Sequence, residues 1–337
     1  MKLHLSLLTS LAAIASNVFA DTAVTDPVGY VTSYVAGSSS GSTYSVISPT
    51  LTRAVEYAGL ASSATPTAIN FPVSTFSPAQ VAAFATGNYW VEVTNGGAAL
   101  EGGWTNITGA TSSSVTTADS MVPFIPGATS TIKIRAHTTI SDYLGTTNSA
   151  GLGAGPDAGI ADEVVFLDAS VAPAPAILTS VFYDGTGWYD SDGNPADTKI
   201  IEPGQGLLTV RKLVPDISFV HVGHVKTGQT QISVYPKDNI VPIPQSVGVT
   251  LAASGLYTGS SATGVNDGPD AGIADEVVIF NNEGLGISYF QDSTGWFDVD
   301  GNPADSTILK EGGGAYLIRK APGAAFSWKA PAVVIAP

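Results

Sequence analysis

The strongest constraint on the fold is an internal duplication in the second half of the chain. A block from Gly155 to Val165 recurs without change from Gly268 to Val278. A second block, from Thr186 to Asp197, returns as Thr294 to Asp305 with two substitutions. Units of one sequence share one fold, and a short repeated unit buries its apolar face against its neighbour. The duplication therefore predicts two tandem modules of the same kind.

Each copy has the pattern of short strands separated by tight turns. In the first turn, Gly193 can adopt positive φ and Pro195 cannot continue a strand ladder. β-Branched and aromatic runs between such turns predict strands at Val164–Leu167, Ser180–Tyr183 and Leu207–Val210. We expect two small sandwich-like β repeats, at residues 135–225 and 226–337.

The region before the duplication, residues 21–134, shows one helix signal among strand signals. Ser77 is a capping residue, Gln80 completes a capping box, Pro78 occupies the first helical position and Gly87 ends the segment. The following residues predict a hairpin, from Tyr89–Thr94 to Gly103–Thr108. The predicted class is all-β, with an N-terminal β region that contains one short helix, then two tandem sandwich-like β repeats.

Composition excludes several functional classes. The 337 residues include 28 acidic and 13 basic side chains, for a formal net charge of −15, and no cysteine. Nucleic-acid binding needs clustered lysine and arginine, which this chain lacks. Without cysteine there are no disulfides, thiolate metal sites or cysteine nucleophiles. With 44% hydrophobic residues, 37 glycines and 21 prolines, the chain is expected to fold with many turns.

The first 20 residues have the form of a secretory signal peptide. Met1–His4 carries a positive charge, Leu5–Ala15 is apolar, and Val18 and Ala20 are the small residues before a cleavage site. An uncleaved anchor is the less favoured alternative. A membrane-spanning helix needs about 20 apolar residues, and no later run approaches that length. We predict a cysteine-free, acidic protein that is exported to the periplasm, cell surface or exterior.

The duplicated acidic turns suggest a calcium site. Calcium prefers about six to eight oxygen ligands from a flexible loop, and like charges crowded in one turn repel unless a cation offsets them. The turn does not match a helix–loop–helix calcium site. Counted from Asp190, its glycine, Gly193, is at the fourth position of the loop and not the sixth, and the twelfth position holds Ile201 in place of glutamate. The alternative is an Asx-turn, in which aspartate bonds its own backbone. The candidate ligands are Asp190, Asp192, Asn194 and Asp197, and Asp298, Asp300, Asn302 and Asp305.

A second acidic motif resembles the closing half of the Asp-Gly-Ile-x-Asp-Glu calcium loops of bacterial surface proteins. It runs from Asp270 to Glu276. The earlier alternating acids of those loops are missing, so the resemblance is limited to Asp275 and Glu276, with Asp162 and Glu163 in the other copy.

Aromatic and histidine residues give weaker signals. Trp188 and Trp296 precede the acidic turns and would stack on a sugar ring if exposed, although a tryptophan in a small β module more often fills the core. His221 and His224 are three residues apart and lie on opposite faces of a strand, so they do not share a metal. No pattern selects a catalytic carboxylate pair.

The chain as a whole resembles one family. The resemblance rests on four features: Asp26–Val31, Tyr89–Thr94 with Gly103-Trp104, the doubled Ala-Asp-Glu-Val strand, and the Gly-x-Gly and Arg-Lys pairs that close each copy. The chain is similar to a family of secreted, β-rich proteins without assigned function, found mainly in Verrucomicrobia-type bacteria. This resemblance implies export and a β-rich fold and implies no mechanism. The acidic turns depart from the family pattern.

These observations favour an exported, non-enzymatic structural or binding protein of the cell surface, periplasm or extracellular space, with calcium in the acidic turns as a hypothesis. The first alternative is a carbohydrate-binding module, and the second is a secreted hydrolase with a carboxylate pair or a Ser/His set. The expected partners are polysaccharides or other surface proteins, with no nucleic acid and no transmembrane span after signal cleavage.

Overall fold

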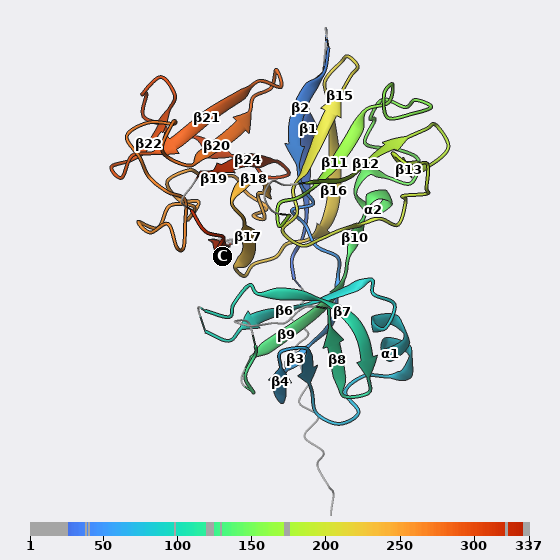
Figure 1. Cartoon of the computed structure of the whole chain (residues 1–337). Helices are drawn as coiled ribbons and strands as arrows, with labels where there is room; N and C mark the ends of the chain where they lie inside the picture. Colours follow the sequence, from blue (N-terminus) through green and yellow to red (C-terminus); the bar gives the residue numbers. More distant parts are fainter. Residues whose placement is uncertain are drawn as a thin grey trace, which may run out of the picture.

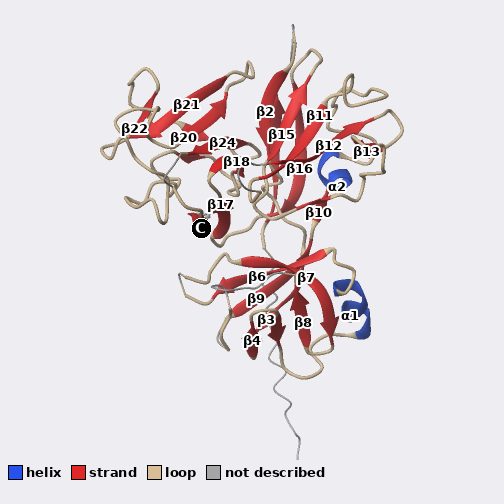
Figure 2. Ribbon diagram, in the orientation of Figure 1, coloured by secondary structure: helices blue, strands red, loops and turns tan. Residues whose placement is uncertain are grey.

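A computed structural model describes residues 26–332 of the chain, except residues 38, 40, 98, 119–124, 129, 172–175 and 321–322. The predicted signal peptide, residues 1–20, lies outside the described part. The described residues are almost all in strands and turns, with two short helices, α1 (Pro78–Phe84) and α2 (Ile140–Leu144) (Figure 2). The predicted all-β class is thereby confirmed. Neither of these two helices has the length and apolar character needed to cross a membrane.

The first repeat contains a five-stranded antiparallel sheet in the order β13-β12-β11-β15-β2. Its strands are β2 (Thr43–Ile47), β11 (Glu163–Asp168), β12 (Ala176–Tyr183), β13 (Trp188–Asp190) and β15 (Leu207–Arg211). Two antiparallel pairs accompany the sheet: β1 (Val28–Val35) with β16 (Ile217–His224), and β10 (Thr138–Thr139) with β14 (Ile200–Ile201). The strand runs predicted from the first copy therefore lie in one sheet.

The second repeat reproduces this arrangement strand for strand. Its five-stranded sheet has the order β18-β24-β20-β21-β22. The strands are β18 (Lys237–Pro242), β20 (Glu276–Phe280), β21 (Gly286–Gln291), β22 (Trp296–Asp298) and β24 (Gly314–Arg319). The accompanying pairs are β17 (Thr230–Val234) with β25 (Phe326–Ala330), and β19 (Val249–Thr250) with β23 (Ile308–Leu309). Each of these strands thus has an equivalent in the first repeat.

The first repeat starts earlier in the chain than the sequence division at residue 134 implies. β2 pairs with β15, so that Thr43 lies opposite Arg211, just as Lys237 lies opposite Arg319 in the second repeat. β1 likewise pairs with β16. Residues 53–137 are therefore an insertion between two strands of the first repeat, and we call them the inserted domain. The pairing spans more than a hundred residues, which local sequence patterns do not encode.

The inserted domain is a seven-stranded antiparallel sheet in the order β3-β9-β6-β7-β8-β5-β4. Its strands are β3 (Val55–Leu60), β4 (Ser63–Thr65), β5 (Ala68–Asn70), β6 (Tyr89–Asn95), β7 (Trp104–Thr111), β8 (Ser114–Thr117) and β9 (Thr131–Ala136). The predicted helix forms as α1: the Ser77 hydroxyl accepts from the Gln80 N–H, and the Ser77 N–H donates to the Gln80 side chain at 3.0 Å. Phe84 of α1 is buried against Phe76 in an edge-to-face contact.

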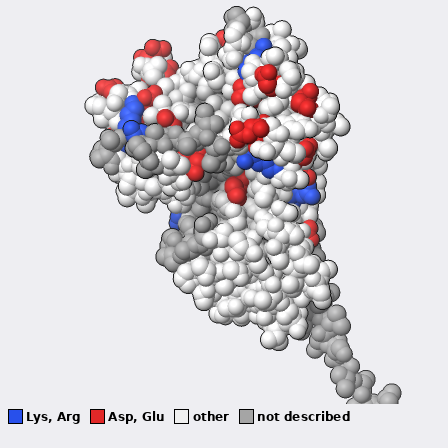
Figure 3. Space-filling view, turned by 45° about the vertical axis from the view of Figure 1, so that its right-hand side comes forward, with Lys and Arg blue, Asp and Glu red and all other residues white. Residues whose placement is uncertain are grey.

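The two repeats pack around an approximate two-fold axis. β2 of the first repeat contacts β20 and β24 of the second, and β18 of the second contacts the equivalent strands β11 and β15 of the first. This reciprocity defines an isologous interface, in which the same surface is used on both sides. The repeats lie side by side with the inserted domain beneath them (Figure 1). On the face shown in Figure 3, charged side chains gather over the repeats and are nearly absent from the inserted domain.

Candidate functional site

The acidic turns fold as Asx-turns stabilised by their own backbone. The Asp190 carboxylate accepts from the N–H groups of Asp192, at 3.0 Å, and Asn194, at 2.8 Å. These amide donors, Asn194 first, lower the pKa of Asp190. Asp298 makes the same two bonds to the corresponding residues at 3.0 and 2.8 Å. Gly193 has φ of 83°, as the turn chemistry predicted.

The other predicted ligands do not join these carboxylates around one point. Asp192 and Asp300 are exposed, and the Asp305 carboxylate accepts from the Trp296 N–H at 3.0 Å. Within the described residues, no three His, Cys, Asp or Glu side chains come close enough together to hold a metal ion. The folded turns therefore do not fit a calcium site built from four converging side chains, and calcium binding stays a hypothesis.

The second acidic motif pairs with the Arg-Lys motif that closes each copy. In the second repeat, the buried Asp275 carboxylate accepts from Arg319 Nη1 at 3.0 Å and from the Lys320 N–H at 2.6 Å. Lys320 Nζ lies 2.6 Å from Glu276 Oε1. These contacts tie the loop before β20 to the end of β24. The two motifs, 44 residues apart from Asp275 to Arg319, are thus one structural unit.

The first repeat contains the same unit with its own residues. The Asp162 carboxylate accepts from Arg211 Nη1 at 2.5 Å and from the Lys212 N–H at 2.7 Å. Lys212 Nζ lies 2.7 Å from Glu163 Oε1. A buried carboxylate requires a charged partner and several donors, and this pairing supplies both. The identity of the two blocks therefore has a structural explanation that needs no cation.

The tryptophans before the acidic turns belong to the cores of the repeats. Trp188 and Trp296 are 0% and 2% exposed, so neither presents a ring to a sugar. Trp188 Nε1 donates to the Gly145 carbonyl at 2.8 Å. In the second repeat, Trp328 Nε1 donates to the Ser254 carbonyl at 2.9 Å. The stacking role considered for Trp188 and Trp296 is wrong, and the core interpretation is confirmed.

The histidines lie in three separate environments. Nε2 of His221 is 3.5 Å from a backbone carbonyl, and Nδ1 of His224 is 3.3 Å from another. His137 is buried, with Nδ1 3.8 Å from Glu202 Oε2. Burial lowers the pKa of His137 to about 4, so the ring is neutral at pH 7. None of these contacts has the geometry of a histidine hydrogen-bonded to both an acid and a serine.

A buried cluster of charges joins the inserted domain to the repeats. Glu92 on β6 is 3.2 Å from Arg135 Nε on β9, and its other oxygen is 3.0 Å from Lys226 Nζ. Asp26, directly before β1, binds both Arg135 and Lys133, the latter at 2.7 Å. Lys226 lies between the two repeats in the chain. These ion pairs therefore hold three parts of the molecule together.

Two hollows lie between the repeats, and the two-fold axis relates them. The open cleft has a volume of about 440 Å³ and is lined by residues 32, 34, 45–46, 279–283, 287, 289, 308, 310–311 and 313–314. The junction groove has about 560 Å³ and is lined by residues 103–106, 167–170, 202–205, 231–233, 235, 239–240 and 327. Ser45 and Asn239 are at equivalent positions of the two repeats. The Ser45 side chain accepts from the Ala36 N–H at 3.1 Å, and the Asn239 side chain accepts from the Tyr235 N–H at 2.8 Å.

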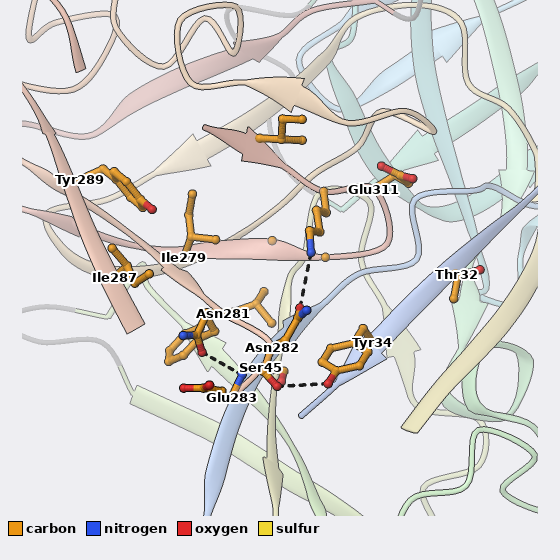
Figure 4. A pocket seen from close by; sticks show the side chains of 16 residues that line it. Thr32, Tyr34, Ser45, Ile279, Asn281, Asn282, Glu283, Ile287, Tyr289 and Glu311 are labelled. Atoms are coloured by element: carbon orange, nitrogen blue, oxygen red, sulfur yellow. Dashed lines mark hydrogen bonds between the residues drawn. The ribbon is translucent and has the colours of Figure 1, made fainter. Parts of the chain in front are cut away.

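The open cleft has an apolar floor and a polar rim (Figure 4). Ile279, Ile287 and Tyr289 of the second repeat form the floor. On the rim, the Tyr34 hydroxyl donates to the Asn282 carbonyl at 3.1 Å and to Asp216 at 2.5 Å. Burial and the neighbouring Asp216 carboxylate raise the pKa of Tyr34 to about 12. These bonds fix the tyrosine across the boundary between the repeats.

The junction groove differs because the inserted domain supplies a third wall. Trp104, at the start of β7, is half-buried, and its Nε1 donates to the Gln231 carbonyl at 3.2 Å. Asn106 Nδ2 donates to Glu202 Oε1 at 3.0 Å. Among the described residues, the hydroxyl of Thr105, which is 6% exposed, and the side-chain oxygen of Asn106 have no hydrogen-bond partner. The groove thus combines a half-buried tryptophan with carboxylate and amide side chains.

Sequence patterns did not identify this groove. In the sequence, Trp104 belonged to a predicted hairpin, and Glu202 and Tyr235 stood out in no motif. The lining residues come from segments between 103 and 327, so only long-range packing brings them together. The hairpin prediction that placed Trp104 at a strand start was the only local signal.

Comparisons with family models, with curated proteins and with solved structures return no match for this chain. The resemblance to the secreted Verrucomicrobia-type family therefore remains a prediction.

Proposed function

We propose that this protein is an exported, non-enzymatic binding protein that holds a neutral polysaccharide in the junction groove. The observation that carries the proposal is that two half-buried aromatic residues, Trp104 and Tyr235, line one hollow of about 560 Å³ between three parts of the chain. Ligand sites typically combine such aromatic surface with a few placed polar groups, and they occur preferentially between domains.

The charges of the groove favour a neutral, hydroxyl-rich ligand. Two carboxylates, of Asp168 and Glu202, line it, and its described lining residues include no lysine, arginine or histidine. An anionic ligand would meet unfavourable charge, whereas carboxylate and amide oxygens accept hydrogen bonds from sugar hydroxyls. The sequence supports the exported location through residues 1–20.

Tryptophan fluorescence provides a direct test of this site. The chain has five tryptophans, and four of them are 0 to 4% exposed, so acrylamide quenching reports mainly on Trp104. The mature chain should lose part of this quenching in the presence of a soluble neutral glucan, mannan or xylan. Isothermal titration with the same polysaccharides gives the affinity.

Two variants locate the binding. Tyr235→Ala should weaken binding at least tenfold, because burying one large side chain against a ligand contributes about 1.5–3 kcal/mol. Tyr289→Ala in the open cleft is the matched control and should leave affinity unchanged, since it removes an aromatic ring from the equivalent hollow. Thermal melts check that both variants are folded. Unchanged quenching and no heat with every neutral polysaccharide would overturn the proposal, as would equal losses in the two variants.

A further inference from the structure

The two-fold arrangement of the repeats allows equivalent surfaces to be compared within one chain. In the second repeat, the inserted domain contacts the free edge of the β17–β25 pair at Gln231. The Gln231 N–H on β17 donates to the Gly102 carbonyl at 3.1 Å, and its side chain donates to the Glu101 carbonyl at 2.9 Å. A backbone segment of the chain thus adds to the free edge of β17.

The equivalent pair in the first repeat, β1 with β16, lacks this contact in the described structure. Four apolar side chains on its outer face are 59 to 74% exposed: Val28, Tyr30, Val220 and Val222. Tyr30 lies opposite Val222, and Thr32 lies opposite Val220, so these side chains are cross-strand or diagonal neighbours. The corresponding face of the second repeat carries Ser233, Ser327 and Lys329 instead. An apolar patch of this kind on a soluble protein indicates an interaction site.

The edge of β1 is also suited to strand pairing. The Val225 N–H donates to the Pro27 carbonyl at 2.7 Å, so by alternation the main-chain groups of Val28, Tyr30 and Thr32 point away from β16. Gly312 of the second repeat lies against the Thr32 carbonyl, so Val28 and Tyr30 form the open part of this edge. From Val28 to Val35 the strand has no charged residue and no proline, the features by which natural edge strands prevent pairing. β18, the edge strand of the second sheet, begins with Lys237 and Asp238.

We propose that the β1 edges of two copies of this chain pair antiparallel about a two-fold axis. Pairing in this way forms a continuous sheet, β16-β1 of one copy joined to β1-β16 of the other, and brings the two apolar patches side by side. The chain carries a net charge of −15, but β1 has no charged residue and no proline, so two β1 edges can approach without like charges meeting at the paired strands. A two-fold contact places the same surface on both partners, as strand pairing of β1 with itself requires.

Sedimentation analysis of the mature chain, residues 21–337, tests this interface. The contact is small, so we expect a monomer–dimer equilibrium with a dissociation constant in the range of roughly 1–100 micromolar. Tyr30→Lys should raise that constant at least tenfold, because it places one lysine of each copy at the shared edge. Val222→Lys is a second variant of the same patch. Val73→Lys, at an 88% exposed apolar residue of the inserted domain, is the matched control and should dimerise like the wild type.

The outcomes separate this interface from the proposed polysaccharide groove. Loss of the dimer in both patch variants, with normal melting temperatures and normal polysaccharide binding, would support the pairing of β1 edges. A wild-type chain that stays monomeric up to about 0.3 millimolar would overturn it. Dimers that persist equally in Tyr30→Lys, or binding of the patch only to a different protein, would overturn it as well.

Discussion

Replacing Asp275 by asparagine removes a negative charge from the interior of the second repeat while it keeps the shape of the side chain. Asp275 and the Arg319 side chain are both 0% exposed. The carboxylate accepts from Arg319 Nη1 at 3.0 Å, from the Asn266 N–H at 2.8 Å and from the Lys320 N–H at 2.6 Å. An amide has one oxygen, so its NH₂ group would face one of these donors.

The free-energy cost of Asp275→Asn comes from the Arg319 charge, which stays buried without its carboxylate partner. Arg319 would keep bonds to main-chain carbonyls, including Gly264 at 3.0 Å, but it would have no counter-charge. Breaking a buried ion pair by removing one partner costs about 3–5 kcal/mol. One buried N–H without an acceptor costs about 1–3 kcal/mol, and the two terms overlap. We therefore expect Asp275→Asn to lower the free energy of unfolding by about 4 kcal/mol.

Urea unfolding followed by tryptophan fluorescence measures this loss, because Trp296 and Trp328 report on the second repeat. The control is Asp300→Asn in the exposed acidic turn, which should change stability by less than about 0.5 kcal/mol. Asp162→Asn should destabilise the first repeat by a similar amount to Asp275→Asn. A loss below about 1 kcal/mol for Asp275→Asn, or an equal loss for Asp300→Asn, would refute the structural explanation of the duplicated motif.

Three further predictions concern the cation hypothesis, pH and the charge cluster. EDTA and added Ca²⁺ should leave the melting temperature unchanged, because backbone amides already occupy the turn carboxylates; a Ca²⁺-dependent rise that Asp192→Ala abolishes would contradict this. His137 has a folded pKa of about 4, below its usual 6.5, so the unfolded chain takes up its proton first. Stability should therefore fall as pH decreases from 6.5 to 4, by up to about 3 kcal/mol from His137. Urea unfolding of His137→Gln should show a smaller slope, and the remainder includes His221, whose pKa burial also lowers. Glu92→Gln leaves Lys226 buried without its carboxylate and Arg135 with Asp26 alone, so limited proteolysis should separate the inserted domain from the repeats faster than in wild type; an unchanged cleavage rate would argue against the cluster as a clamp.

Local chemistry made part of this structure predictable from the sequence. The capping box of Ser77 and Gln80 and the positive φ of Gly193 depend on hydrogen bonds or backbone freedom within a few residues. The duplicated blocks indicated two repeats of one fold, because equal sequences bury equal faces. The core position of Trp188 followed from the general preference of a large apolar ring for burial.

Only tertiary packing decided the parts that suggest function. The pairing of β2 with β15 assigns the first strands to the first repeat, and it depends on segments more than a hundred residues apart. The acidic motif around Asp275 resembled a calcium loop until the structure placed Arg319 beside it. The junction groove and the bare β1 edge exist because the inserted domain covers one side of the two-fold arrangement and not the other. Sequence patterns report on neighbours along the chain, whereas charge pairing, grooves and uncovered strand edges depend on which distant surfaces meet.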